Sequence, residues 1–404
     1  MRELRRILEE ADRLREAGTA AVVATIVEID GSSYRLEGAR MLVRPGGEYV
    51  GTISGGCLEG EVAERAMQVL ETGHPDLVTL EQQEGEDPFG FGSGCGGTIR
   101  VLLEPFRAAA GSPPGPLDLL RHCVARRHPG ALATVYRTEG DLEGETGRHL
   151  LVTEDTPSGR GDIEADALRA TVAEDAAETL RKGQALRTTY TLSRGRADVL
   201  IEHVEPPLRL LIFGEEHDVG PLVRQAALLG WESVVVGGSP VPTLEEEFPD
   251  AGDHVSLPHA EQVSTQVAPV GACDAAVAMT HNYIRDRAVL RFLLRSEVGY
   301  VGALGARSRL DRLAEDFADG DTPADRAARE AMADGRLHAP VGLDIGAETP
   351  EEIALSIAAE VQAVFAGAGG GFLSDGTGRI HPSAARPETG EAAAASRDEE
   401  DPTA

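Results

Sequence analysis

The first candidate for chemistry is a cysteine in a glycine-rich turn, Ser54-Gly55-Gly56-Cys57-Leu58. If Ser54 caps a helix, Cys57 lies in its first turn, where the positive helix terminus favours a thiolate. A thiolate attacks sulfur and binds soft metals, and Gly55 and Gly56 would let a bulky ligand reach free N–H groups. A small buried cysteine at a helix start would have the same sequence, so the residues alone leave both interpretations open.

A second cysteine, Cys95, lies in the segment GSGCGG, directly before an apolar stretch. A packing cysteine does not need the backbone freedom that Gly94 and Gly96 provide, whereas a thiol that faces a ligand could use it. A flexible surface loop is the alternative. Cys123 and Cys273 lie in apolar, periodic stretches and are predicted to be packing residues.

Two arginines follow another glycine turn, Gly31-Ser32-Ser33. Arg40, Leu42 and Arg44 are spaced two residues apart in a predicted strand over 39–44, so both guanidinium groups should leave the same face. Together they could hold a phosphate or another oxyanion. For the arginines taken alone, a solvated strand face with ordinary ion pairs is the simpler interpretation.

A third group of residues follows the strands of the second half of the chain. Residues 208–365 alternate short apolar runs with helical patterns, which predicts a parallel sheet covered by helices on both faces. Carboxyl ends of such strands meet at the edge where open α/β sheets bind ligands. The residues expected there are Gly214, His217, His281, Asp286 and Gly305. His281 could act as acid, base or hydrogen-bond donor, or cap and orient the next helix with Asp286.

The turn after the first of these strands is a damaged dinucleotide-binding motif. The second glycine of a Rossmann pyrophosphate turn is replaced by Glu216, and Glu215 and Glu216 would repel a pyrophosphate. The second strand ends in Gly237-Gly238-Ser239, without an acidic residue for a ribose. NAD(P) binding is therefore doubtful, although an NAD(P)-dependent oxidoreductase with His281 as acid/base remains the alternative function.

The elements that must position these residues fall into two domains. Residues 1–205 are interpreted as one α/β unit, with helices predicted at 1–17, after Ser54, at 116–127 and at 164–182. Glu205-Pro206-Pro207 marks the boundary, and residues 208–365 form the Rossmann-like domain. Residues 368–404 are rich in Gly, Ala and Glu without periodicity, which predicts a largely disordered acidic tail.

The composition excludes several classes of protein. The chain has 404 residues, of which 41% are hydrophobic, so it is not wholly disordered. It shows no membrane span and no signal peptide, which predicts a cytoplasmic protein. With 68 acidic and 38 basic residues its net charge is -30, which argues against nucleic-acid or membrane partners. Lys182 is the only lysine, and this pattern favours a high-salt cytosol over an ordinary acidic protein.

Together these motifs resemble the XdhC/CoxI family, the accessory factors of xanthine dehydrogenase and carbon monoxide dehydrogenase. In the first domain the resemblance rests on GSSYRLEGARMLV, SGGCLEGEV and GCGGTIRVLLEP. In the second it rests on LLIFGEEHDVGPLVRQAALLGW, MTHNYIRDRAVL, YVGALGARSR and HAPVGLDIGAETPEEIALSIAAEV. It covers most of residues 10–365.

The resemblance implies a chaperone of the molybdenum cofactor rather than an enzyme. Such a protein would bind the cofactor, protect it during sulfuration by a cysteine desulfurase, and help insert it into a molybdenum hydroxylase apo-enzyme. It also implies an XdhC/CoxI domain at 1–205 and a Rossmann-like domain at 208–365, and a homodimer is a further expectation. Carried over to this chain, the motif cysteines that would contact molybdenum are Cys57 and Cys95. Gly214 and His217 match the family's glycine–histidine turn, and His281 and Asp286 its histidine–aspartate pair.

Overall fold

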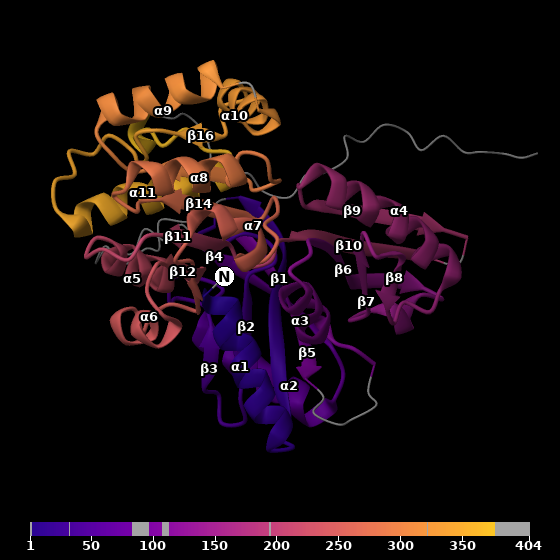
Figure 1. Ribbon diagram of the computed structural model, residues 1–404. Helices are drawn as coiled ribbons and strands as arrows, with labels where there is room; N and C mark the ends of the chain where they lie inside the picture. Colours follow the sequence, from indigo (N-terminus) through magenta and orange to yellow (C-terminus); the bar gives the residue numbers. More distant parts are fainter. Residues whose placement is uncertain are drawn as a thin grey trace, which may run out of the picture. The chain divides into compact units, whose positions relative to one another are not determined.

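The computed structural model describes residues 2–31, 33–82, 97–106, 113–193, 195–320 and 322–375 (Figure 1). Cys95, with Gly94 and Gly96, lies outside the described residues, as does the predicted tail from residue 376 onward. The chain forms two compact units. The N-terminal unit consists of Ala11–Cys123 and Pro129–Val204. The C-terminal unit covers the described residues from Glu205 to Asp375, and it includes the start of the chain up to Glu10 and the segment Val124–His128.

The N-terminal unit begins with a five-stranded antiparallel sheet in the order β3-β2-β1-β5-β4. Its strands are β1 (Ala21–Gly31), β2 (Arg40–Val43), β3 (Tyr49–Gly51), β4 (Asp76–Gln82) and β5 (Gly97–Phe106). Helix α2 (Glu59–Thr72) packs on one face through Val62, Ala66 and Val69, which are spaced three to four residues apart. Helix α1 (Arg2–Glu16) precedes the sheet in the chain.

A second five-stranded antiparallel sheet follows in the order β8-β7-β6-β10-β9. Its strands are β6 (Gly130–Gly140), β7 (His149–Thr153), β8 (Thr156–Gly161), β9 (Leu186–Leu192) and β10 (Gly195–Val204). Helix α3 (Pro116–Arg126) precedes it, and helix α4 (Asp166–Lys182) covers one face through Leu168, Val172 and Ala176.

The two sheets are copies of one topology. Each half of the unit runs helix, three strands, helix, two strands, and the strand orders correspond one to one. Thr25 pairs with Arg40 in the first sheet, and Thr134 pairs with His149 at the equivalent place in the second. The pairing register also shifts in both sheets after equivalent residues, so that Val27 and Tyr136 occupy corresponding bulges. We call β1–β5 with α2 the first repeat and β6–β10 with α4 the second repeat.

The repeats pack through the sheet faces that their helices leave uncovered. Val27 and Leu102 of the first repeat form a buried cluster with Tyr136 and Leu200, their equivalents in the second. Strand alternation places these residues opposite those that contact α2 and α4. Side chains on this inner face are therefore shared between the two repeats. The interpretation of residues 1–205 as one α/β unit did not include this duplication.

The C-terminal unit contains a six-stranded parallel sheet in the order β13-β12-β11-β14-β15-β16. Its strands are β11 (Arg209–Phe213), β12 (Glu232–Gly237), β13 (Asp253–Ser256), β14 (Asp274–Ala278), β15 (Tyr300–Ala303) and β16 (Leu337–His338). One face packs against α5 (Val219–Leu229), α6 (Val241–Glu247) and α11 (Pro350–Phe365). The other packs against α7 (Val263–Gln266), α8 (Tyr283–Leu293), α9 (Arg307–Asp319) and α10 (Pro323–Ala333). The predicted parallel sheet with helices on both faces is confirmed.

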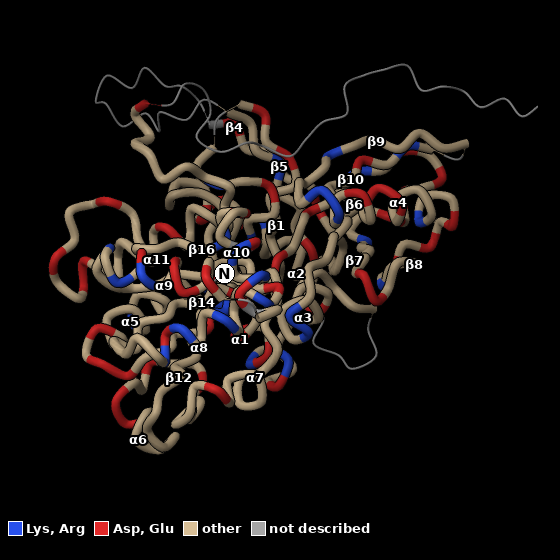
Figure 2. Tube along the Cα trace, turned by 45° about the horizontal axis from the view of Figure 1, so that its top comes forward, with Lys and Arg blue, Asp and Glu red and all other residues tan. Residues whose placement is uncertain are grey.

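The distribution of charged side chains reflects the excess of acidic residues in the chain. Figure 2 shows acidic residues along the loops and helices of both units. The basic residues are arginines apart from Lys182. Among the described helices, none combines the length and the apolar character needed to cross a membrane.

Candidate functional site

Three of the predicted motifs meet at one end of the first sheet. Gly31, the last residue of β1, pairs in register with Gly97, the first residue of β5. In the loop after β1, Arg35 Nη1 donates to Thr52 Oγ1 at 2.8 Å. The Tyr34 ring lies beside the next loop, because a Cβ placed on Gly55 would be 3.9 Å from it. The structure therefore brings the segments around residues 31–35, 52–57 and 97 together.

Ser54 and Glu59 organise the loop that carries Cys57. Ser54 Oγ accepts hydrogen bonds from three successive backbone N–H groups, those of residues 56–58, at 3.1–3.2 Å. The buried Glu59 carboxylate accepts from the Ser54 N–H at 2.8 Å and from the Ser54 hydroxyl. Burial disfavours the charged form of Glu59, but these hydrogen bonds outweigh it and lower its pKa. The loop is thus held by its own side chains.

The placement of Cys57 differs from the prediction. Helix α2 begins at Glu59, so Cys57 lies before the helix and not in its first turn. Ser54 does not cap α2. Its hydroxyl oxygen instead accepts hydrogen bonds from the loop N–H groups, which the prediction had left free for a ligand. The Cys57 thiol is nevertheless exposed, at the tip of a turn in which Gly56 has a φ of 110°.

The two predicted oxyanion-binding arginines do not converge on an open surface. Arg40 shares a strand face with Leu42, as expected, but that face packs against the second repeat. Its Nη1 donates to Glu202 Oε1 at 2.9 Å and its Nη2 donates to Glu202 Oε2, and the Arg40 side chain is only 6% exposed. Arg44 is more exposed and forms an ion pair with Glu48 at 2.8 Å. Arg40 therefore joins the repeats.

The pair equivalent to Arg40–Glu202 is His149–Glu104, which was not predicted from the sequence. Nε2 of His149 lies 2.7 Å from Glu104 Oε1, and Nδ1 lies 3.2 Å from Thr134 Oγ1. Burial disfavours a charged imidazole, but the charge and hydrogen bond of Glu104 outweigh it and raise the pKa of His149. Glu104 lies in the quoted motif GCGGTIRVLLEP, where an acidic residue inside an apolar strand was the available signal.

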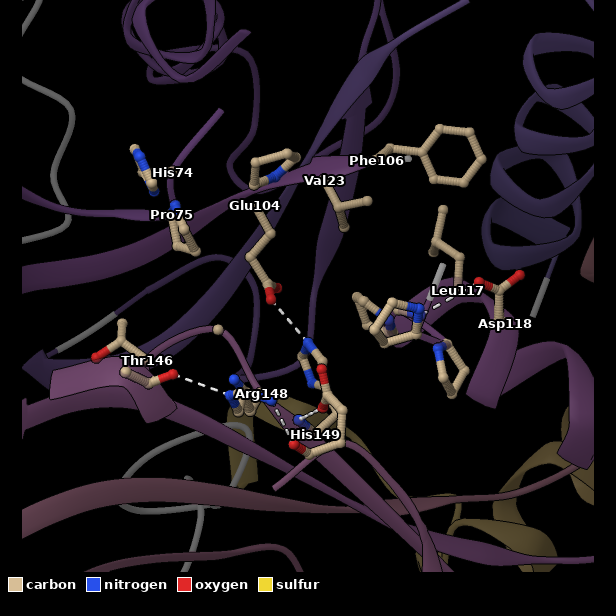
Figure 3. Close-up of a pocket in the computed structure, with 18 residues that line it drawn as sticks. Val23, His74, Pro75, Glu104, Phe106, Leu117, Asp118, Thr146, Arg148 and His149 are labelled. Carbon is tan, nitrogen blue, oxygen red and sulfur yellow. Dashed lines mark hydrogen bonds and ion pairs between the residues drawn. The ribbon is translucent and has the colours of Figure 1, made fainter. Parts of the chain in front are cut away.

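A cavity of about 350 Å³ lies beside this pair in the N-terminal unit (Figure 3). Val23, Glu104 and Phe106 line it from the ends of β1 and β5, and Pro75 and Arg148 line it from neighbouring loops. Val23 pairs with Glu104 near the start of β1, whereas Gly31 ends that strand. The cavity and the Cys57 loop therefore lie toward opposite ends of the first sheet.

In the C-terminal unit, Gly214 and His281 line a cavity of about 300 Å³ at the carboxyl edge of the parallel sheet. His217 and Gly305 are not among the described residues that line it. Glu215 reaches the end of β12, where its Oε2 accepts the Ser239 N–H at 2.8 Å. A Cβ placed on Gly237 would lie 2.6 Å from the same oxygen. The carboxylate thus occupies the end of the second strand, where a Rossmann fold binds ribose.

The predicted histidine–aspartate pair is arranged differently. His281 Nε2 contacts Asp218 Oδ2 at 2.8 Å, and His281 adopts a φ of 54°, in the left-handed region. Asp286 instead accepts from Thr280 N at 3.1 Å and pairs with Arg309. Burial raises the pKa of Asp286, and its hydrogen bonds oppose the shift. Asp218 was not predicted as the partner of His281, although both residues follow neighbouring strands of the parallel sheet.

No group of three or more His, Cys, Asp or Glu side chains that could hold a metal ion occurs in the described part of the chain. Cys95, the other thiol expected at the Cys57 loop, follows β4 in the chain and precedes Gly97.

Comparisons with known proteins agree with this division of the chain. The model of the XdhC and CoxI family matches residues 14–81 and 123–191, and each of these segments overlaps one of the two repeats. The model described as the XdhC Rossmann domain matches residues 210–361. The chain is 31% identical over 352 residues to a Bacillus subtilis (strain 168) protein described as a probable subunit of xanthine dehydrogenase, covering 87% of this chain and 94% of that protein.

Two further similarities cover most of the chain. It is 26% identical over 361 residues to the molybdenum cofactor insertion chaperone PaoD of Escherichia coli (strain K12), covering 89% of this chain and 88% of PaoD. A crystal structure from Bacillus halodurans, described as a xanthine dehydrogenase, superposes with a TM-score of 0.65 at 28% identity, covering 89% of this chain and 96% of that one. With both domain types present in order, the chain belongs to the XdhC and CoxI family.

Proposed function

We propose that this protein is an accessory factor that binds the molybdenum cofactor and supports its insertion into a molybdenum hydroxylase. The observation that carries the proposal is the exposed Cys57 thiol on a loop fixed by Ser54 and Glu59. The similarity to PaoD, a protein named as a molybdenum cofactor insertion chaperone, supports the same function. The partners that we propose are an apo-hydroxylase and, for sulfuration of the cofactor, a cysteine desulfurase.

The residues at the end of the first sheet suit this cargo. The cofactor supplies a pterin dithiolene, a phosphate and a thiophilic metal centre. Cys57 would hold the metal centre through its sulfur, since thiolates are soft ligands. The loop needs little further ordering when the cofactor arrives, because Ser54 and Glu59 already fix its backbone. Arg35, held at Thr52 beside this loop, would lie near the phosphate.

A test of this proposal is the replacement Cys57→Ala in the full chain. We expect the variant to lower the rate at which cofactor is delivered to an apo-hydroxylase by roughly tenfold, the effect of about 1.4 kcal/mol of lost binding free energy. The measurement is hydroxylase activity and molybdenum content after incubation with cofactor. Cys123→Ala is the control, because burial raises the pKa of the Cys123 thiol to about 11 and keeps it inert. Equal delivery by both variants would reject the role of Cys57.

We also propose that the C-terminal unit binds NAD(P) weakly or not at all. Glu215 accepts the Ser239 N–H where a ribose would bind, and Glu216 replaces the glycine that lets pyrophosphate approach. Calorimetry with NAD and NADP should show no micromolar binding to the full chain. The double variant Glu215→Ala, Glu216→Gly should bind more tightly than the wild type, because it removes both carboxylates. Micromolar binding to the wild type would restore the oxidoreductase alternative.

We propose that the protein functions at high salt concentration. At a net charge of -30 the carboxylates repel one another over a Debye length of about 30 Å at 0.01 M salt, which shrinks to about 3 Å at 1 M. The folded chain packs these charges more closely than the unfolded chain does. The melting temperature should therefore rise steeply from low to molar potassium chloride, and a flat dependence would contradict salt adaptation.

A further inference from the structure

The cavity of the C-terminal unit lies where the connections of the parallel sheet change direction. The chain leaves β11 toward β12 on one side of the sheet and leaves β14 toward β15 on the other, and β11 and β14 are neighbours. Open α/β sheets bind ligands at this switch point. Gly214 and His281, which follow β11 and β14, both line the cavity of about 300 Å³, a volume in the range of small-molecule sites.

The loop after β11 supplies an acidic residue that β12 lacks. In a Rossmann fold an acidic residue after the second strand binds ribose, but β12 ends in Gly237-Gly238-Ser239. The Glu215 side chain reaches this place instead, and its Oε2 accepts the Ser239 N–H at 2.8 Å. A Cβ on Gly237 would lie 2.6 Å from Oε2, and a Cβ on Gly238 would lie 3.3 Å from Oε1. The two glycines therefore make room for a carboxylate at the ribose position.

The Glu215 carboxylate can accept further hydrogen bonds. Its Oε1 has no hydrogen-bond partner among the described residues and, unlike Glu104 Oε2, is not sealed inside the protein. An ionised carboxylate has about four acceptor positions, of which the Ser239 N–H uses one. Because Glu215 lines the cavity, two neighbouring hydroxyl groups of a ligand, such as the 2′ and 3′ hydroxyls of ribose, could donate to it.

The charges around the cavity select against a phosphate on such a ribose. Glu216 lines the same cavity, at the turn where a Rossmann fold holds pyrophosphate. Arg285 is the only arginine or lysine among the described lining residues, and its Nη2 donates to the Leu257 carbonyl oxygen at 2.8 Å. Two carboxylates beside one engaged guanidinium favour a neutral or cationic group at the 5′ position of the ribose.

A strained histidine also marks this cavity as a ligand site. His281 has a φ of 54°, and backbone strain of this kind collects at functional sites. Its Nε2 lies 2.8 Å from the buried Asp218 carboxylate, which holds the ring in place. Nδ1 has no hydrogen-bond partner among the described residues. When Nε2 carries the proton that Asp218 accepts, Nδ1 is an acceptor for an N–H or O–H group of the ligand.

We propose that the switch-point cavity binds an unphosphorylated ribonucleoside, whose 2′ and 3′ hydroxyl groups donate to Glu215. The shared chemistry has two sources, a free nucleoside with a 5′ hydroxyl group and a nucleoside with a cationic 5′ sulfonium group, such as S-adenosylmethionine. The ligand is not the cargo proposed above, because that cofactor carries a phosphate. The inference does not involve the Cys57 loop and therefore stands independently of the proposed function.

Calorimetry with the full chain tests the inference. The ligands are adenosine, guanosine, cytidine, uridine and S-adenosylmethionine, and we expect at least one to bind with a dissociation constant below about 1 mM. Tighter binding of S-adenosylmethionine than of adenosine would identify the cationic source, and the reverse would identify the free nucleoside. For each nucleoside that binds, the 5′-monophosphate and the 2′,3′-dideoxy derivative should bind at least roughly tenfold more weakly. Absence of binding by all five ligands, or a monophosphate that binds as tightly as its nucleoside, would overturn the proposal.

The replacement Glu215→Gln tests the assignment of the ribose acceptor. We expect it to weaken binding by roughly tenfold to a hundredfold, because a single amide oxygen is left to accept from both the Ser239 N–H and the ribose. Glu246→Gln is the matched control, because Glu246 is an exposed carboxylate on α6 that does not line the cavity, and it should leave binding unchanged. Equal affinities of Glu215→Gln and the wild type, or equal losses in the two variants, would overturn the assignment.

The double variant Glu215→Ala, Glu216→Gly separates a nucleoside site from a dinucleotide site. It should bind NAD(P) more tightly than the wild type, because relief of the repulsion against two phosphates outweighs the loss of one ribose contact. It should bind the nucleoside more weakly, because the same change removes the acceptor of the ribose hydroxyl groups. Changes in the same direction for both ligands would contradict the proposed role of Glu215.

Discussion

The two repeats of the N-terminal unit share a scaffold but differ in the loops that connect it. In the first repeat the segment between β3 and α2 is the long loop that carries Ser54 and Cys57, whereas in the second repeat residues 162–165 join β8 to α4 directly. Both helices end at equivalent glycines, Gly73 and Gly183, in the left-handed conformation. The comparison teaches that strand pairing preserves the duplicated framework while the candidate chemistry lies in loops of one copy.

The two ion pairs that join the repeats also differ, both in charge and in hydrogen bonding. Arg40–Glu202 and His149–Glu104 occupy equivalent strand positions, and each crosses from one repeat to the other. In the arginine pair, Arg40 donates to both carboxylate oxygens of Glu202. The histidine pair can lose its charge and leaves one oxygen without a described partner. We infer that both pairs hold the repeats together and that the contribution of the histidine pair depends on pH.

The largest effect should come from breaking the arginine pair. Arg40→Ala would leave the Glu202 carboxylate buried without its partner, which typically costs about 3–5 kcal/mol of unfolding free energy. Denaturant unfolding followed by circular dichroism measures the loss. Arg44→Ala is the control, because its pair with Glu48 is exposed and should contribute under about 1 kcal/mol. Similar losses in the two variants would contradict the assignment of Arg40 to the junction between the repeats.

A methyl group at the turn before β2 should produce the next largest effect. Gly38 has a φ of 88°, and a Cβ there would lie 2.1 Å from Glu202 Oε1. Gly38→Ala should therefore cost about 1–3 kcal/mol from backbone strain, together with any displacement of Glu202. The equivalent variant Gly147→Ala would lie 3.5 Å from Glu104 Oε1, although it would also meet Pro75 at 2.7 Å. If thermal unfolding shows Gly38→Ala to be the milder change, the comparison of the two pairs is wrong.

The smallest effect concerns pH, and it should appear only in the histidine pair. The pKa of His149 is raised above its ordinary value of 6.5 because Glu104 outweighs the cost of burial. The resulting stability is fully present below about pH 6.5 and is lost as the pH rises through the higher folded-state pKa. The melting temperature of the wild type should therefore fall relative to that of His149→Arg between pH 6 and pH 9. A constant difference between the two proteins would show that His149 does not titrate in this way.

Local sequence patterns predicted much of the scaffold. The alternation of apolar runs and helical periods over residues 208–365 indicated the parallel sheet, and the predicted helices at 116–127 and 164–182 correspond to α3 and α4. These features depend on neighbours in the chain, so hydrophobic spacing and turn residues are sufficient to find them.

The contacts that build the candidate sites are distant in sequence, and this is why they were missed. Glu202 lies 162 positions from Arg40, so the strand pattern showed that the arginine leaves one face but not what covers that face. The duplication was visible only as short similar segments, such as VLLE at 101–104 and VLIE at 199–202. Ser54 had the sequence of a helix cap, but its hydroxyl serves the preceding loop and α2 begins later.

The most direct test of the proposed function is the molybdenum content of the protein after exposure to its cargo. The full chain would be incubated with cofactor released from a molybdenum hydroxylase, passed through gel filtration, and analysed for molybdenum and pterin. We predict that both co-elute with the wild type and that their amount falls in Cys57→Ala but not in Cys123→Ala, whose thiol is buried. Elution of wild-type protein free of both would contradict the proposal that the chain binds the molybdenum cofactor.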